Sequence, residues 1–87
     1  MKVAVWDTYV TRNDGKLMHF DILVEDGKSN AEQVFEYGKK YLKTVLQDGQ
    51  PLSSEECNFC HIAVAPANVE EQIKKDGYSI LEMENCY

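Results

Sequence analysis

Two stretches rich in β-branched and aromatic residues, 2–10 and 17–24, come first in the chain and predict a pair of β-strands. The polar segment 12–16 lies between them and contains Asn-Asp-Gly, which is typical of a tight turn. We therefore expect the chain to begin with a β-hairpin.

The length of the hairpin loop decides which side chains share a face, because a one-residue slip moves a whole strand to the other face. A two-residue loop, Asp14-Gly15, would bury Asp7 among apolar residues. A three-residue loop, 13–15, keeps Asp7 out of the core, and we prefer it. On the reverse face it groups Asp7, Tyr9, His19 and Asp21.

The most regular pattern in the chain predicts a helix over residues 30–46. Ser29 and Glu32 have the spacing of a capping box, and apolar or small residues then recur at helical intervals. Gly38 lies within this apolar stripe, where it either permits close approach to the sheet or is a tolerated surface residue.

The second half of the chain predicts a strand, a helix and a strand. Segment 53–63 reads as extended, interrupted or ended by the group 57–61. Pro66 suits the first turn of a short helix that Gly77 would end, and residues 78–84 form the last strand. We expect an α+β fold of order ββαβαβ, a mostly antiparallel four-stranded sheet with two helices packed on one face.

Length and composition are those of one ordinary globular domain. The 87 residues, 44% of them hydrophobic and 28% charged, suffice for one core, so we treat 1–87 as a single domain.

The charge balance narrows the choice of partner. Nine Lys and Arg against fifteen Asp and Glu leave a net charge of −6. Nucleic acids and anionic membranes attract cationic side chains, so neither is expected as a partner. A small molecule or another protein is therefore the expected class of partner. The sequence does not specify an oligomeric state.

We expect the chain to stay in the cytosol. It has no signal-peptide hydrophobic region and no apolar stretch that approaches the length of a membrane span. Its three cysteines are an odd number, which fits reduced thiols better than a disulfide framework.

The motif Cys57-x-x-Cys60-His61 has four interpretations. Covalent haem attachment is disfavoured without an export signal, and Glu55 and Glu56 disfavour a reactive dithiol. A zinc site would need a turn that points both sulfurs inward, because residues i and i+3 of a straight strand face oppositely. The fourth interpretation, reduced cysteines that only pack, is the one we favour.

A zinc site would draw its ligands from few residues. The candidates are Cys57, Cys60, Cys86 and one of His61 or His19. No cofactor is expected, and the candidate metal for this motif is zinc.

The reverse face of the hairpin is the second candidate site. Asp7, Tyr9, His19 and Asp21 could orient a ligand, act in acid–base chemistry or hold a divalent cation. The simpler interpretation, which we favour, is the solvated face of a one-sided antiparallel sheet.

Three strings extend over much of the chain and resemble a small bacterial family: Asp7-Thr8-Tyr9-Val10, Met18-His19-Phe20-Asp21 and Ser54-Glu55-Glu56-Cys57-Asn58-Phe59-Cys60-His61. The family is known as domain of unknown function twenty-twenty-four. The resemblance implies a compact α+β domain and assigns no catalytic residue.

The function expected from the sequence is therefore a non-catalytic binding domain. The alternative is a metal or thiol site built on Cys57, Cys60 and His61. No local motif places a nucleophile or base beside an oxyanion donor, so an enzyme is the less favoured class.

Overall fold

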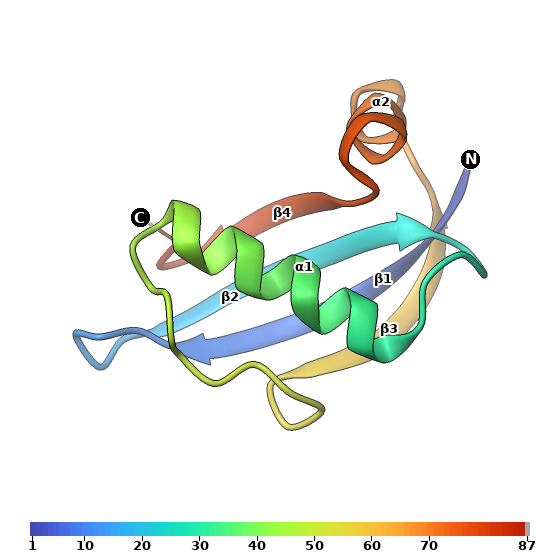
Figure 1. Ribbon diagram of the computed structural model, residues 1–87. Coiled ribbons are helices and arrows are strands. Elements are labelled where there is room, and N and C mark those ends of the chain that lie inside the picture. The colour runs from blue at the N-terminus through green and yellow to red at the C-terminus, as the bar shows by residue number, and fades with distance from the viewer. Residues whose placement is uncertain (87) are drawn as a thin grey trace.

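The four strands of the domain form one antiparallel sheet (Figure 1). The computed structural model describes residues 1–86. In chain order the elements are β1 (Lys2–Thr11), β2 (Leu17–Glu25), α1 (Ala31–Thr44), β3 (Cys57–Val64), α2 (Ala67–Asp76) and β4 (Ser79–Glu84). The strands lie in the order β3-β1-β2-β4, and every neighbouring pair is antiparallel. The predicted α+β class and the order of elements are confirmed.

The β1–β2 hairpin closes through a three-residue loop. The Arg12 N–H donates to the Lys16 carbonyl at 2.8 Å, which leaves residues 13–15 as the loop. Gly15 has a φ of 86°, in the left-handed region that favours glycine. The preferred loop, and with it the register of the two strands, is confirmed.

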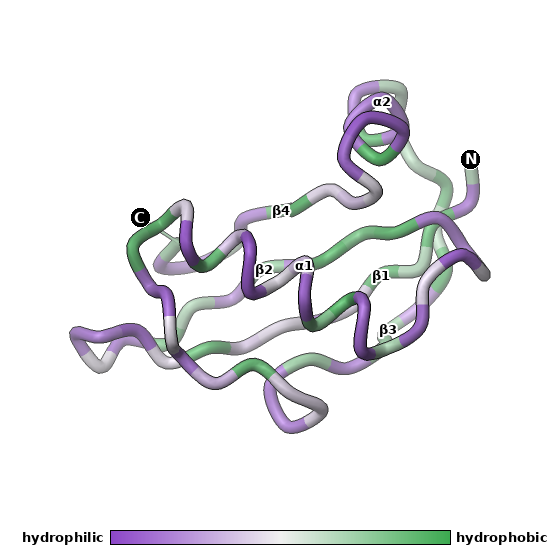
Figure 2. The backbone as a smooth tube through the Cα atoms, in the orientation of Figure 1, coloured by the Kyte–Doolittle hydropathy of each residue, from purple (hydrophilic) through white to green (hydrophobic). Residues whose placement is uncertain are grey.

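Helix α1 covers one face of the sheet and encloses the main hydrophobic core. The strands β1 and β2 contribute Ala4, Val10, Met18, Phe20, Ile22 and Val24. The helix contributes Val34, Tyr41 and Leu42. Figure 2 shows the hydrophobic colouring along much of β2, which lies beneath α1.

Gly38 brings α1 close to the side chains beneath it. A Cβ atom at this position would lie 2.9 Å from the Ile22 Cδ1 and 2.5 Å from the Leu52 Cδ1. Such a contact is shorter than van der Waals packing permits. Of the two interpretations of Gly38, close packing is therefore the correct one.

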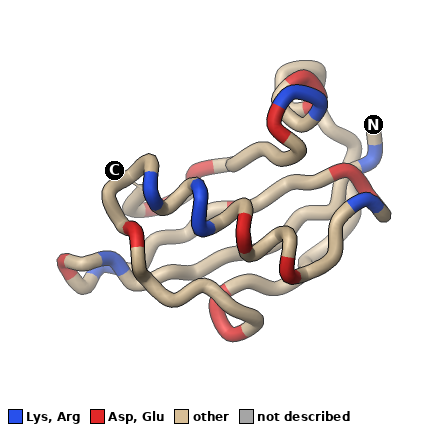
Figure 3. Tube along the Cα trace, viewed as in Figure 1, with Lys and Arg blue, Asp and Glu red and all other residues tan. Residues whose placement is uncertain are grey.

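The N-cap of α1 is Asn30, one residue after the predicted capping box. The Asn30 side chain accepts a hydrogen bond from the Gln33 N–H at 2.8 Å, so Ser29 is not the cap. Glu32 lies in the first turn and Lys43 in the last, as the helix dipole favours (Figure 3).

Strand β3 carries the whole Cys57–His61 motif, which was predicted to interrupt or end an extended segment beginning at Ser53. Instead, residues 53–56 form a turn, and the Cys57 N–H donates to the Ser53 carbonyl at 2.9 Å. The strand continues through the motif with one β-bulge, at which its pairing with β1 shifts between Val5 and Trp6.

Helix α2 packs against the other face of the sheet, so the prediction that both helices share one face is corrected. Its Ile73 belongs to a separate buried cluster with Val3, Val5 and Leu23. These strand residues alternate with those under α1, and their side chains therefore point the opposite way. The uninterrupted apolar run 3–6 is the sequence signal of a strand segment covered on both faces.

Gly77 ends α2 in a conformation that only glycine adopts without strain, which leads to our first prediction. Its φ is 89°, and an added Cβ would lie 2.8 Å from the Tyr37 Oη. We expect Gly77→Ala to lower the free energy of unfolding by about 2 kcal/mol, measured by urea denaturation.

Gly49→Ala is the matched control. Gly49 has a φ of 91°, but an added Cβ would meet nothing within 4 Å. This substitution should lower the free energy of unfolding by only about 1 kcal/mol, which is the cost of the backbone conformation alone. Equal losses in the two variants would contradict the steric role given to Tyr37.

Candidate functional site

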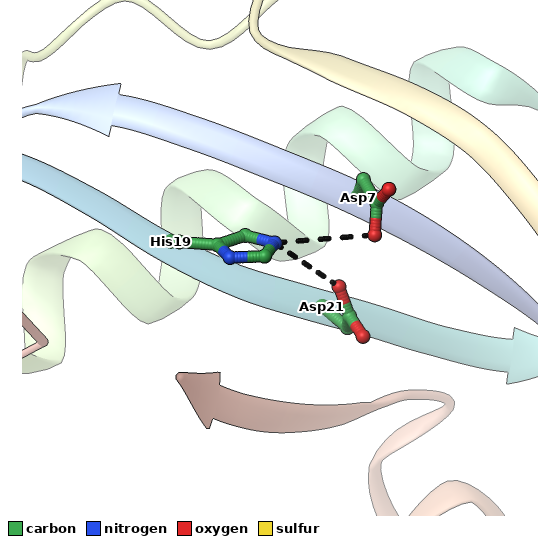
Figure 4. Close-up of side chains that lie close together, drawn as sticks. All are labelled: Asp7, His19 and Asp21. Carbon is green, nitrogen blue, oxygen red and sulfur yellow. Dashed lines mark ion pairs between the residues drawn. The ribbon is translucent and has the colours of Figure 1, made fainter. Parts of the chain in front are cut away.

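The register of β1 and β2 brings three metal-ligating side chains together on the face opposite α1. Asp7 lies directly across from Asp21, and His19 follows on the same face. The His19 Nε2 lies 3.8 Å from the Asp21 Oδ1 and 4.0 Å from the Asp7 Oδ1 (Figure 4). One ligand atom from each of the three residues lies within 4.8 Å of the other two.

Tyr9 stacks on one face of the His19 imidazole. The rings of Tyr9 and His19, which face each other across the strands, stack with centroids 4.2 Å apart and planes 11° apart. With one ring face covered in this way, the Nε2 edge of the imidazole is directed toward the two carboxylates (Figure 4).

Two atoms of this group are buried without a hydrogen-bond partner among the described residues: the His19 Nε2 and the Asp21 Oδ1. The distance of 3.8 Å between them is too long for a hydrogen bond. Asp21 is only 7% exposed. An unsatisfied buried polar atom costs about 1–3 kcal/mol, so the arrangement is unfavourable for stability alone.

The electrostatics of the group are also unfavourable for stability. Burial, followed by a hydrogen bond and charge repulsion from Asp7, raises the pKa of Asp21 to about 6, against an ordinary value of 3.8. The charges of His19 and His61 lower the pKa of Asp21 and so partly offset this increase. The protein thus holds two carboxylates close together in a place where their joint ionisation is costly.

The β-bulge of β3 adds two residues to the same face. Val5 pairs with His61 and Trp6 with Phe59, so Cys60 is the extra residue. The Cys60 Sγ lies 3.2 Å from the His61 Nδ1. The sequence treated the motif and the Asp7–His19–Asp21 group as separate candidates, and no sequence signal for the bulge connects them.

The C-x-x-C pair does not converge on one site. Cys57 is buried in the core under α1, where its Sγ accepts a hydrogen bond from the Thr8 Oγ1 at 3.3 Å. Cys60 is exposed, and its neighbour is His61. No turn joins the two sulfurs, since both residues lie within β3. Cys86 is likewise in the core, and none of the three cysteines forms a disulfide.

Residues 1–83 match the family described as "Domain of unknown function (DUF2024)". The chain belongs to this family. The DUF2024 domain also resembles the NMR structure of protein NE1680 from Nitrosomonas europaea, with 41% sequence identity, complete coverage of both chains and a TM-score of 0.86. No curated protein matches the chain. The comparisons thus show the family and the fold of the chain.

Neither helix of the DUF2024 domain, within residues 1–86, is long and apolar enough to span a membrane.

The raised pKa of Asp21 leads to the second prediction. Because its pKa rises on folding, Asp21 contributes stability below about pH 4 that is lost as the pH increases through about 6. Asp21→Asn, which cannot ionise, should therefore be more stable than the wild type by about 1–2 kcal/mol at pH 8, with little difference at pH 4. Urea unfolding at both pH values, in the presence of a chelator, measures this.

Asp26→Asn serves as the control, because Asp26 is an exposed residue in the turn after β2. It should change stability by less than about 0.5 kcal/mol at either pH. A wild type that is more stable than Asp21→Asn at pH 8 would show that the carboxylate is favourably solvated or paired, contrary to this account.

Proposed function

We propose that this DUF2024 domain is a non-catalytic binding domain whose ligand is a divalent cation held by Asp7, His19 and Asp21. The observation that carries the proposal is the pair of buried, unpartnered atoms, the His19 Nε2 and the Asp21 Oδ1, which face each other across 3.8 Å. A cation between them would satisfy both.

The donor set suits a metal ion. Two carboxylates and an imidazole are ordinary ligands of zinc and of other first-row divalent ions. A cation would also convert the repulsion between Asp7 and Asp21 into attraction, because both carboxylates would then face a positive charge.

The distances are close to those of a coordinated ion. Two ligands that each lie about 2.1 Å from one metal are about 3.0–3.4 Å apart. The His19 Nε2 lies 3.8 Å and 4.0 Å from its two carboxylate oxygens. Side-chain adjustments of less than about 1 Å would therefore bring the three atoms to coordination distance.

The alternative built on Cys57, Cys60 and His61 finds less support. Cys57 is buried under α1 and hydrogen-bonded by Thr8, on the face away from Cys60. Burial raises the pKa of Cys57, which disfavours the thiolate that both metal binding and dithiol chemistry require. The three free thiols fit the reducing cytosol, which is the setting we propose for the domain.

Titration of the full chain with Zn²⁺, followed by calorimetry and by NMR, tests the function. We expect one ion per chain, with the largest shifts at His19 and at the two aspartates. Asp21→Asn should weaken the affinity more than tenfold, because it replaces a negatively charged carboxylate ligand with a neutral amide. Saturation at 100 times the dissociation constant should stabilise the wild type by about 2.7 kcal/mol.

Asp26→Asn is again the matched control, since it removes the same charge from an exposed turn away from the site. Its affinity should equal that of the wild type. Absence of binding by the wild type, or equal loss in both variants, would contradict the proposed function.

A further inference from the structure

Cys60 and His61 lie where they can join the proposed cation site. Phe59 packs its ring against Trp6 on the α1 side, with centroids 5.9 Å apart. The bulge then directs the next two side chains to the other face, since His61 pairs with Val5, whose side chain points away from α1. That face also carries Asp7, His19 and Asp21.

The charges of the two groups already act on one another. Desolvation, together with a hydrogen bond and the charge of Asp7, raises the pKa of the Cys60 thiol, and Asp21 adds to the effect. The charge of His61 in turn lowers the pKa of Asp21. The geometry that brings the two groups together is the pairing of β3 with β1, in which Asn58 lies across from Asp7 and His61 across from Val5.

We propose that Cys60 is the fourth ligand of the site formed by Asp7, His19 and Asp21, and that His61 orients the Cys60 sulfur. The inference rests on the cation-binding function proposed above and names the class of ion. One sulfur, one nitrogen and two oxygen ligands make a four-coordinate set that selects zinc-like ions over magnesium and calcium.

The same arrangement argues against a nucleophilic role for Cys60. An activated cysteine needs cationic surroundings, whereas Cys60 lies beside two carboxylates that disfavour its thiolate. A bound zinc-like ion would instead favour the Cys60 thiolate, because a metal deprotonates the thiol that coordinates it. His61 would then donate a hydrogen bond to the thiolate from the Nδ1, which lies 3.2 Å from the Sγ.

Coordination by Cys60 would require its sulfur to move closer to the other three ligand atoms. Its sulfur lies outside the group of ligand atoms that are within 4.8 Å of one another. Cys60 is exposed, however, so its side chain has room to move toward these atoms.

Cobalt(II) substitution of the full chain is the direct test. A thiolate bound to Co²⁺ gives an intense near-ultraviolet charge-transfer absorption that oxygen and nitrogen ligands do not give. We expect this absorption in the wild type and its loss in Cys60→Ser. Cys60→Ser should also weaken Zn²⁺ binding at least tenfold and leave any Mg²⁺ binding unchanged. An NMR spectrum of each variant verifies that it is folded.

Cys57→Ser is the matched control, because Cys57 belongs to the same motif but is buried under α1. It should retain the charge-transfer absorption. Cys86→Ser, a second buried cysteine in the core, serves the same purpose if Cys57→Ser fails to fold.

The outcomes separate this inference from the proposed function. Loss of the absorption in Cys60→Ser alone supports a cysteine ligand. Metal binding by the wild type without the absorption, or with the absorption retained in Cys60→Ser, overturns the role of Cys60 while the cation site of Asp7, His19 and Asp21 stands. A wild type that binds neither Co²⁺ nor Zn²⁺ overturns both.

Discussion

The register between β1 and β2 is the constraint on which the rest of the structure depends. Side chains alternate between the two faces of a sheet, so the three-residue loop at 13–15 assigns every residue of the hairpin to a face. Phe20 and its apolar neighbours are thereby placed under α1, and His19 and Asp21 on the other side. A slip of one residue would bury the two charged side chains and expose the core.

The two helices divide the sheet unequally, and neither of them covers the candidate site. α1 extends along one face and covers the main core (Figure 1). α2 packs on the other face against Val3, Val5 and Leu23, at the start of β1 and the end of β2. Within residues 1–86, no helix packs on the remainder of that face, around Asp7 and His19, which can therefore carry polar side chains.

The candidate site resembles a functional centre because its arrangement is expected to cost the fold stability. Asp21 is buried beside a second carboxylate, and neither its Oδ1 nor the His19 Nε2 finds a hydrogen bond among the described residues. A domain selected for stability alone would have an amide or an apolar side chain here. A cation would resolve the repulsion and the two unpaired atoms together, which explains why we assign the function to this face.

The sequence by itself determined the order of elements and the hairpin register, because these follow from local turn chemistry. It also determined that Asp7, Tyr9, His19 and Asp21 share one face, because side chains alternate along a strand. It also indicated that Cys57 and Cys60 face oppositely unless a turn intervenes. Only the tertiary structure decided which face α2 covers and that a bulge at Cys60 turns His61 toward the aspartates. Both depend on how β3 pairs with β1, a contact between residues 49 to 62 positions apart, which no local pattern encodes.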